Sequence, residues 1–239
     1  MSYALRPEVA WHGGAQQLRR CPLFHNVGAA QVRAVLRNTG TRCVGRGGFY
    51  FRQGDRATEV YVLIRGRVKL VRCRPEARRG ILQFILPMEP FGYEAALGGA
   101  GHVVSAQASE ESEALVWHAT ALVHIMTSHP MIARNSLRLM AERIQGKWER
   151  INGLLTESLE QRVARALLLL GSRIGRRAER SPAIELTLNH QDLAAFVGTT
   201  PFTISRIFSG WRRHRIVDAG RGWVVIWPRR LATRVGAHG

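Results

Sequence analysis

Lysine is almost missing from this chain: Lys69 and Lys147 are the only two, so 33 of its 35 basic residues are arginines. Acidic residues are few as well, 17 in 239, which leaves a formal net charge of +18. A genome that favours arginine codons would explain part of this surplus. The size of the charge still makes the chain a candidate for binding nucleic acid or another polyanion.

Long hydrophobic runs are also lacking. The longest, residues 164–170, is interrupted by Arg165, so no segment is expected to cross a membrane. The N-terminus has no basic-then-apolar signal pattern. With 46% hydrophobic residues the chain can still build packed cores, and its length suits two domains. We therefore expect a folded, cytoplasmic protein.

Cysteine is scarce, and Cys21, Cys43 and Cys73 stand far apart. No CxxC pair or His–Cys spacing suggests zinc, and in a cytosolic setting these residues are expected to be reduced thiols. Cys73 is a candidate redox thiol, but without an evident activating partner the sequence favours an inert one. A Ser–His–Asp order, a phosphate-binding loop and an HExxH motif are all absent. We therefore expect neither an enzyme nor a metal site.

The first half of the chain shows the periodicity of strands. Residues 1–20 carry little pattern and are interpreted as an N-terminal arm. Residues 21–126 contain short segments broken by glycine, and charged and apolar residues alternate from Arg67 to Arg72. Further strands are expected at residues 81–86, 103–108 and 114–118. Many short strands at this spacing predict a sandwich, barrel or roll.

The hydrophobic period changes after Pro130. Apolar residues then recur at three-, four- and seven-residue spacings, which predicts a long amphipathic helix within residues 127–155. Such a helix after a small β domain has little of its own to pack on, so we expect it to pair with its copy in a homodimer. Packing on its own domain is the alternative. The predicted dimer stripe consists of Leu137, Met140, Ile144, Ile151 and Leu154.

Residues 156–239 form the third part, where the positive charge is densest. Ser158 and Gln161 have capping-box spacing, so a new helix is expected to begin there. Residues 160–239 hold 14 arginines and 5 acidic residues, a net charge of +9. Residues 1–159 carry the same net charge over twice the length. This distribution favours a nucleic-acid-binding element in the C-terminal part.

From residue 186 the chain is predicted to form two short helices joined by a turn. Asn189 followed by Asp192 marks the start of the first helix, and Gly198 ends it because glycine tolerates a left-handed backbone. Thr200 can cap the second helix, with Pro201 in its first turn, where no amide hydrogen bond is lost. This is a helix-turn-helix pattern, in which the second helix enters the major groove of DNA.

The second helix has one apolar face and one small, basic face. Arg206 on the basic face is placed for a bidentate contact to guanine, the commonest specific pairing. A hairpin over residues 216–227 would form a wing, with Arg221 at its tip facing a phosphate. An αα-hairpin with a solvated arginine face is the alternative. The residues expected to meet double-stranded DNA are Gln191, Thr200, Phe202, Thr203, Ser205, Arg206, Arg212 and Arg221.

The order of parts resembles the family of the cyclic-AMP receptor protein and FNR, bacterial homodimeric transcription regulators. Three segments carry the resemblance: FRQGDRATEVYVLIRGRVKL, PFGYEAALGG and LNHQDLAAFVGTTPFTISRI. The resemblance covers residues 20–230. It implies an α+β fold with a jelly-roll-like β-roll, a long dimerisation helix and a C-terminal winged helix-turn-helix. It also implies RNA polymerase as a partner and a pseudo-palindromic operator.

The effector segment departs from the pattern of the relatives that bind cyclic AMP. Those relatives carry a Glu for the ribose where this chain has Tyr93, and Glu94 follows one position later. Their Arg for the cyclic phosphate is replaced by Val104, before Ser105. A buried phosphate without its guanidinium loses a charge-assisted bidentate pair. The four pocket candidates Tyr93, Glu94, Val104 and Ser105 therefore argue against control by cyclic AMP.

Other cofactors of the family have little support. Iron–sulfur clusters need about four thiolates, and Cys21 alone cannot supply them. A haem- or gas-sensing variant stays open, because four histidines lie in or near the predicted roll. A histidine in such a place is more often a surface or hydrogen-bonded residue than a ligand. These histidines are His102, His118, His124 and His129.

The second helix departs from the family as well. Relatives often carry a Glu that accepts from a cytosine amine where this chain has Pro201 and Phe202, and Phe202 can only contact a thymine methyl. The operator is therefore expected to differ from the best-known palindrome of the family. The competing function is an effector-binding basic module or a nucleoid-like binder with little sequence preference. The signal, the direction of regulation and the operator stay open.

Overall fold

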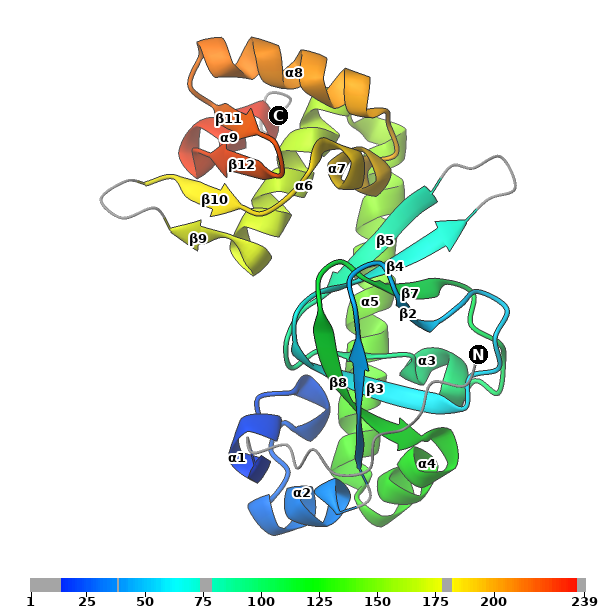
Figure 1. Ribbon diagram of the computed structural model, residues 1–239. Helices are drawn as coiled ribbons and strands as arrows, with labels where there is room; N and C mark the ends of the chain where they lie inside the picture. Colours follow the sequence, from blue (N-terminus) through cyan, green and yellow to red (C-terminus); the bar gives the residue numbers. More distant parts are fainter. Residues whose placement is uncertain (1–13, 38, 74–78, 178–181, 236–239) are drawn as a thin grey trace. The chain divides into compact units, whose positions relative to one another are not determined.

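The computed structural model describes residues 14–37, 39–73, 79–177 and 182–235. The chain divides into two compact units, residues 1–77 with 82–145 and residues 78–81 with 146–239. The long helix α5 (Pro130–Thr156) runs through the point of division. After short N-terminal helices come the strands of the roll, then this helix and then a winged helix-turn-helix, which is the predicted order of the three main parts (Figure 1).

The first unit is built on two four-stranded sheets, in the orders β1-β8-β3-β6 and β2-β7-β4-β5. Neighbours such as β3 and β8 pair antiparallel. Side chains from both sheets join in one core cluster, so the sheets pack face to face as the predicted β-roll. The strands are β1 (Gly40–Val44), β2 (Phe49–Phe51), β3 (Glu59–Arg65), β4 (Val68–Cys73), β5 (Arg79–Ile85), β6 (Pro90–Phe91), β7 (Ser105–Ala108) and β8 (Ser112–His118).

The first sheet is buried on both faces. Along β3, Tyr61 and Leu63 face the other sheet, whereas Val60 and Val62 enter a second core cluster. Helices cover that second face. They are α1 (Gly14–Leu18), α2 (Ala29–Leu36), α3 (Tyr93–Leu97), α4 (Ala119–Ser128) and the first half of α5.

The N-terminal part of the chain differs from the prediction. Residues 14–20 of the expected arm, and residues 21–36 of the expected strands, instead contain α1, a 3₁₀ turn at Pro22–Phe24 and α2. Leu18 and Phe24 are buried in the second core cluster. The Asn135 side chain of α5 donates hydrogen bonds to the carbonyls of Leu23 (3.0 Å) and His25 (2.8 Å). Contacts with residues far away in the sequence stabilise these short helices. Their own sequences therefore need no strong helical periodicity, and none was available to predict them.

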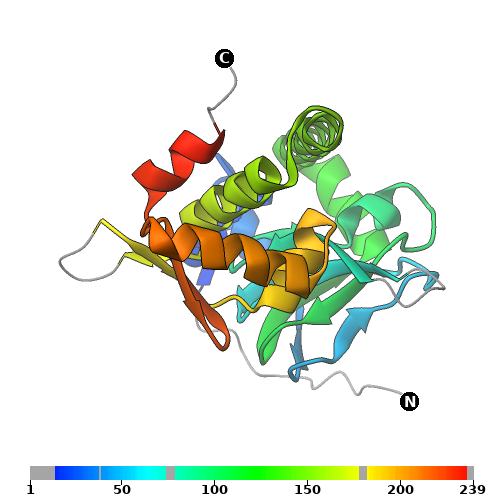
Figure 2. The ribbon, with the colours of Figure 1, turned by 90° about the horizontal axis from the view of Figure 1, so that it is seen from above.

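The second unit packs helices α6 to α9 with a four-stranded sheet of order β11-β12-β10-β9. The predicted capping box is confirmed, because Ser158 N donates to Gln161 Oε1 (2.8 Å) and Gln161 N to Ser158 Oγ (3.3 Å). In Figure 2, the β11–β12 hairpin starts from the end of α8. The elements are α6 (Leu159–Ile174), β9 (Arg176–Arg177), β10 (Ile184–Leu186), α7 (His190–Val197), α8 (Pro201–Arg213), β11 (Val217–Gly220), β12 (Trp223–Ile226) and α9 (Pro228–Val235).

Candidate nucleic-acid interface

The turn between α7 and α8 has the geometry that the sequence predicts. Asn189 Oδ1 accepts a hydrogen bond from Asp192 N (2.7 Å), which starts α7. Gly198 follows α7 in the left-handed region at φ 84°. Thr200 Oγ1 then accepts from Thr203 N (3.2 Å), with Pro201 as the first residue of α8. Local capping thus sets where the second helix starts.

Gly198→Val is expected to destabilise the second unit by about 1–3 kcal/mol, because a β-branched residue is strained in the left-handed region. A Cβ at Gly198 would meet nothing within 4 Å, so the cost comes from the backbone alone. Gly210→Ala is the matched control, since Gly210 lies inside α8, also with open space around it. Urea unfolding should show Gly210→Ala neutral or stabilising by about 0.5–1 kcal/mol. Equal losses in both variants would contradict this account.

Helix α8 presents a polar face to solvent. Ile204, Ile207, Phe208 and Trp211 are buried beneath it. On the opposite face Ser205 and Arg206 are exposed, and Phe202 is 78% exposed at the first turn. Phe202 and Arg206 are one helical turn apart, so both side chains are available to a base edge on this face.

The remaining predicted DNA contacts lie in the same unit. Gln191 is exposed at the start of α7, and the Thr200 and Thr203 hydroxyls lie 2.9 Å apart at the start of α8. Arg212 Nε donates to Asp218 Oδ1 (3.1 Å), which ties the last turn of α8 to β11. Arg212 therefore has a structural partner as well as an exposed position.

His190 is a residue of this surface that the sequence analysis missed. Its Nδ1 lies 3.1 Å from Ser205 Oγ, and its ring meets Phe208 edge-on with centroids 5.1 Å apart. Burial, helped by the nearby Arg212 charge, lowers the pKa of His190, which favours the neutral imidazole. His190 thus orients the Ser205 hydroxyl on α8. Its position directly after the cap Asn189 was the available signal.

The hairpin after α8 is the predicted wing. Strands β11 and β12 pair from Val217↔Ile226 to Gly220↔Trp223, and Arg221 is exposed at the tip. Gly222 turns the chain at φ 87°. A Cβ at Gly220 would lie 2.4 Å from the Trp223 ring, so a larger residue there would displace that ring.

The four effector-pocket candidates are not brought together. Tyr93 and Glu94 lie in α3, after Gly92 at φ 80°, and Tyr93 is fully buried in the cluster on the helix side of the sheet. Val104 packs against the core between the sheets instead. Ser105 Oγ accepts from Gln53 N (2.9 Å).

Arg143 of α5 holds the α3 segment. Its guanidinium forms an ion pair with Glu94, donates to the Pro90 carbonyl (2.6 Å) and lies 4.9 Å from the centre of the Tyr93 ring. Glu94 is thereby neutralised by a residue 49 positions along the chain.

Aromatic rings fill the space between the two sheets. Phe91 lies 5.1 Å from Tyr50 and 5.0 Å from Tyr61, measured between ring centroids. His102 stacks on Phe51 at 3.6 Å, with 8° between the ring planes. Burial lowers the pKa of His102, which favours its neutral form. The rings thus occupy the interior of the roll themselves.

Among the described residues, no group of three or more His, Cys, Asp or Glu side chains is placed to hold a metal ion. Cys21 is buried, and burial raises the pKa of its thiol to about 12. Cys43 is exposed, and the Cys73 side chain lies outside the described residues. In the same part of the chain, no helix is long and apolar enough to span a bilayer.

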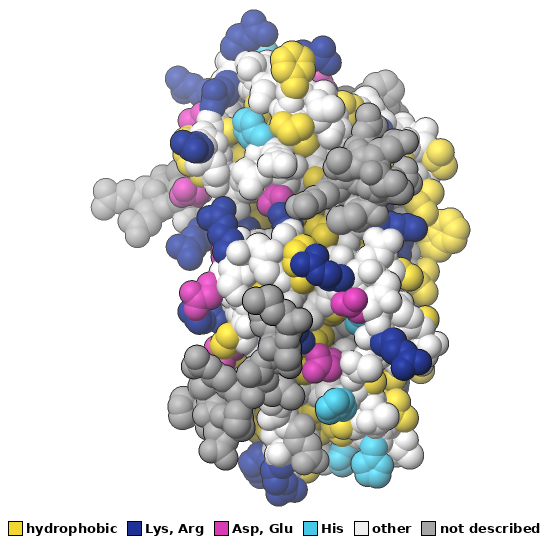
Figure 3. Space-filling model, turned by 45° about the vertical axis from the view of Figure 1, so that its right-hand side comes forward, with side chains coloured by type: hydrophobic (Ala, Val, Ile, Leu, Met, Phe, Trp, Pro, Cys, Tyr) yellow, Lys and Arg dark blue, Asp and Glu magenta, His cyan; other side chains and the backbone are white. Residues whose placement is uncertain are grey.

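The apolar stripe of α5 is exposed. Four of the five predicted residues, Leu137, Ile144, Ile151 and Leu154, are between 47% and 67% exposed, and Met140 is half-buried against its own domain. Trp148 and Leu155, one heptad apart, widen the stripe. Figure 3 shows hydrophobic side chains along one edge of the molecule. The inner face of α5 packs into the core of the first unit through Ile132 and Leu139.

A sensor-like roll, a long helix and a winged helix-turn-helix define a transcription regulator that binds DNA. Residues 161–234 match the family model of the Crp-like helix-turn-helix domain, and residues 41–129 that of the cyclic nucleotide-binding domain. The chain belongs to the Crp/Fnr family of transcription regulators.

Relatives from both branches of the family match most of the chain. The chain is 28% identical to the cyclic AMP receptor protein of Thermus thermophilus, over 91% of this chain and 98% of that protein. It is 26% identical to the fumarate and nitrate reduction regulatory protein of Vibrio cholerae, over 77% and 73%. The solved structure of FixK2 from Bradyrhizobium japonicum shares the fold, with a TM-score of 0.74 at 21% identity, covering 84% of this chain and 99% of FixK2.

Proposed function

We propose that the protein is a homodimer that reads a pseudo-palindromic operator with α8 and is not controlled by cyclic AMP. One observation carries the proposal: α8 is capped at its N-terminus by Thr200, is buried on one face and exposes Arg206 on the other. A helix fixed in this way presents its N-terminal half to the major groove.

Direct base reading is assigned to three residues. Arg206 donates two hydrogen bonds to a guanine, Phe202 contacts a thymine methyl group, and Ser205 bonds a base edge while His190 orients it. The others position the protein on the phosphate backbone, and Arg221 does so from the wing. The positioning residues are Gln191, Thr200, Thr203, Arg212 and Arg221.

Dimerisation is supported by the exposed stripe of α5. Apolar residues at heptad spacing pack into the holes of a facing helix. A two-fold dimer places its two recognition helices in successive major grooves, about 34 Å apart. The proposal assigns residues 21–126 to a sensor-like domain, residues 127–155 to the dimerisation helix and residues 156–239 to the DNA-binding domain. It also includes a cytoplasmic location and RNA polymerase as a partner.

Cyclic AMP is expected to leave operator affinity unchanged within about twofold. Val104 offers no guanidinium for the cyclic phosphate. Tyr93 is buried on the face of the sheet that the helices cover, and Glu94 is already paired with Arg143. Fluorescence anisotropy on the selected operator, with and without 1 mM nucleotide, checks this (~1 mM far exceeds a micromolar dissociation constant). The cyclic AMP receptor protein of Thermus thermophilus, tested in parallel, is the comparison. A tenfold gain in affinity would overturn effector independence.

Sequence specificity separates this proposal from a nucleoid-like binder. The measurement is a mobility shift of the full-length protein on selected and on scrambled duplexes, across a range of salt. A regulator binds the selected site roughly 10³-fold or more tightly at physiological salt. A generic basic module gives equal affinities that fall together as salt rises, and that result would contradict the proposal.

A further inference from the structure

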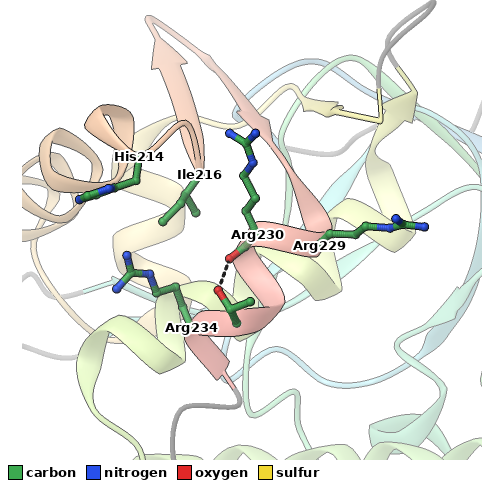
Figure 4. Close-up of a pocket in the computed structure, with 6 residues that line it drawn as sticks. His214, Ile216, Arg229, Arg230 and Arg234 are labelled. Atoms are coloured by element: carbon green, nitrogen blue, oxygen red, sulfur yellow. Dashed lines mark hydrogen bonds between the residues drawn. The ribbon is translucent and has the colours of Figure 1, made fainter.

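A basic pocket lies at the C-terminal end of α8. Its volume is about 330 Å³, and it is formed by the turn that follows α8 and by α9. Figure 4 shows Arg230 and Arg234 extending from successive turns of α9 on either side of Ile216, with His214 across from them. None of the described residues that line it carries a carboxylate. The lining residues are His214, Ile216, Arg229, Arg230, Thr233 and Arg234.

The charge of this pocket is not neutralised within the described residues, where no carboxylate forms an ion pair with its three arginines. Arg212, only two residues before His214, does have such a partner in Asp218. Arg230 Nη1 donates to the Arg215 carbonyl (3.2 Å), which fixes its guanidinium beside the turn. A fixed guanidinium with most of its donors available is preorganised for an oxyanion.

We propose that this pocket binds a phosphate of the DNA backbone at the edge of each half-site. The inference rests on the proposed function, because it takes the N-terminal half of α8 to lie in the major groove. Thirteen residues make α8 about 20 Å long, whereas the major groove is about 12 Å wide. His214 follows Arg206 by eight residues, or about 12 Å along the helix axis. The pocket therefore reaches the phosphate chain that borders the groove.

The chemistry of the pocket fits this ligand. Arginines bind phosphate oxygens bidentately, and His214 adds a further polar group, whereas the Thr233 hydroxyl already donates to the Arg230 carbonyl (2.7 Å). A backbone phosphate carries no sequence information, so the pocket adds affinity and fixes the orientation of α8 without changing the preferred sequence.

The test is the full-length variant Arg230→Ala/Arg234→Ala on the selected operator. Each lost phosphate contact lowers the slope of log affinity against log salt by about 0.9, so a dimer loses about 2 in slope. Affinity at 0.15 M salt should fall about tenfold on operator and random DNA alike (~0.15 M being physiological ionic strength). Ethylation interference should lose one phosphate per half-site. Arg230→Lys/Arg234→Lys keeps the charge and should keep most of the slope.

Arg33→Ala/Arg134→Ala is the matched control, since it removes the same two charges from exposed side chains of the other unit. Thermal melting by circular dichroism should be unchanged in all variants, because Arg230 is exposed and Arg234 half-buried. An unchanged salt slope of affinity together with an unchanged interference pattern would overturn the phosphate site. Loss of transcription activation with normal DNA binding would also overturn it, because that result indicates an acidic protein partner. If the unaltered protein selects no sequence, the proposed function fails first.

Discussion

Ile144→Asp is expected to convert the dimer into monomers. Ile144 is the central a-type residue of the stripe on α5 and is 53% exposed in the single chain. In a two-fold dimer Ile144 would lie close to the same residue of the second copy. The variant therefore loses two buried isoleucines and brings two carboxylates together. Burying an isoleucine is worth about 1.5–3 kcal/mol, and the unpaired buried charges add to that loss. Sedimentation velocity measures the change.

The loss of the dimer should also remove specific DNA binding. Two linked recognition helices gain about 10²–10⁴-fold in affinity over one, because the second contact is intramolecular. Val123→Asp is the control, since Val123 is an equally exposed apolar residue on α4, outside the stripe. A dimeric Ile144→Asp protein with normal operator affinity would show that α5 is not the interface.

Arg206→Ala is expected to cost roughly 1–3 kcal/mol of operator affinity per half-site and to relax the preference at one base pair. Arg206 is exposed on the same face of α8 as Ser205, which is oriented by His190. Within the described residues, its side chain forms no ion pair like the one by which Arg212 ties α8 to β11. The loss should therefore reflect missing base contacts. Gel shifts on operators with each base pair replaced in turn measure it.

Arg221→Ala at the tip of the wing is the comparison variant. A phosphate contact is blind to sequence, so this variant should weaken binding to operator and random DNA by the same factor and lower the salt slope by about 1 per protomer. Arg206→Ala should do neither on random DNA. If Arg206→Ala weakened binding to both kinds of DNA equally, its assigned role in base reading would be wrong.

The recognition helix could be predicted because its determinants are local. Asn189, Gly198, Thr200 and Pro201 act on backbone groups within a few residues, so capping and turn chemistry can be deduced from the chain alone. The stripe of α5 is predictable for the same reason, because it is a periodic pattern on one helix.

The remaining features depend on contacts that are distant in sequence. The helices of residues 14–36 are held by a sheet face to which Val60 and Trp117 contribute, and no local pattern shows that face is buried. Arg143 reaches Glu94 from the long helix, and its position gives no sign of that pairing. The basic pocket needs α9 to fold back beside the end of α8, which sequence spacing does not predict.

Selection of bound sites from random duplex DNA tests the central claim most directly. The protein is used as purified, without added nucleotide, and the bound pool is sequenced. Two inverted half-sites whose centres lie about 10 base pairs apart, each with an invariant guanine, are the predicted result. A pool with no enriched sequence, or a single half-site without its inverted copy, would contradict a homodimer that reads DNA through α8.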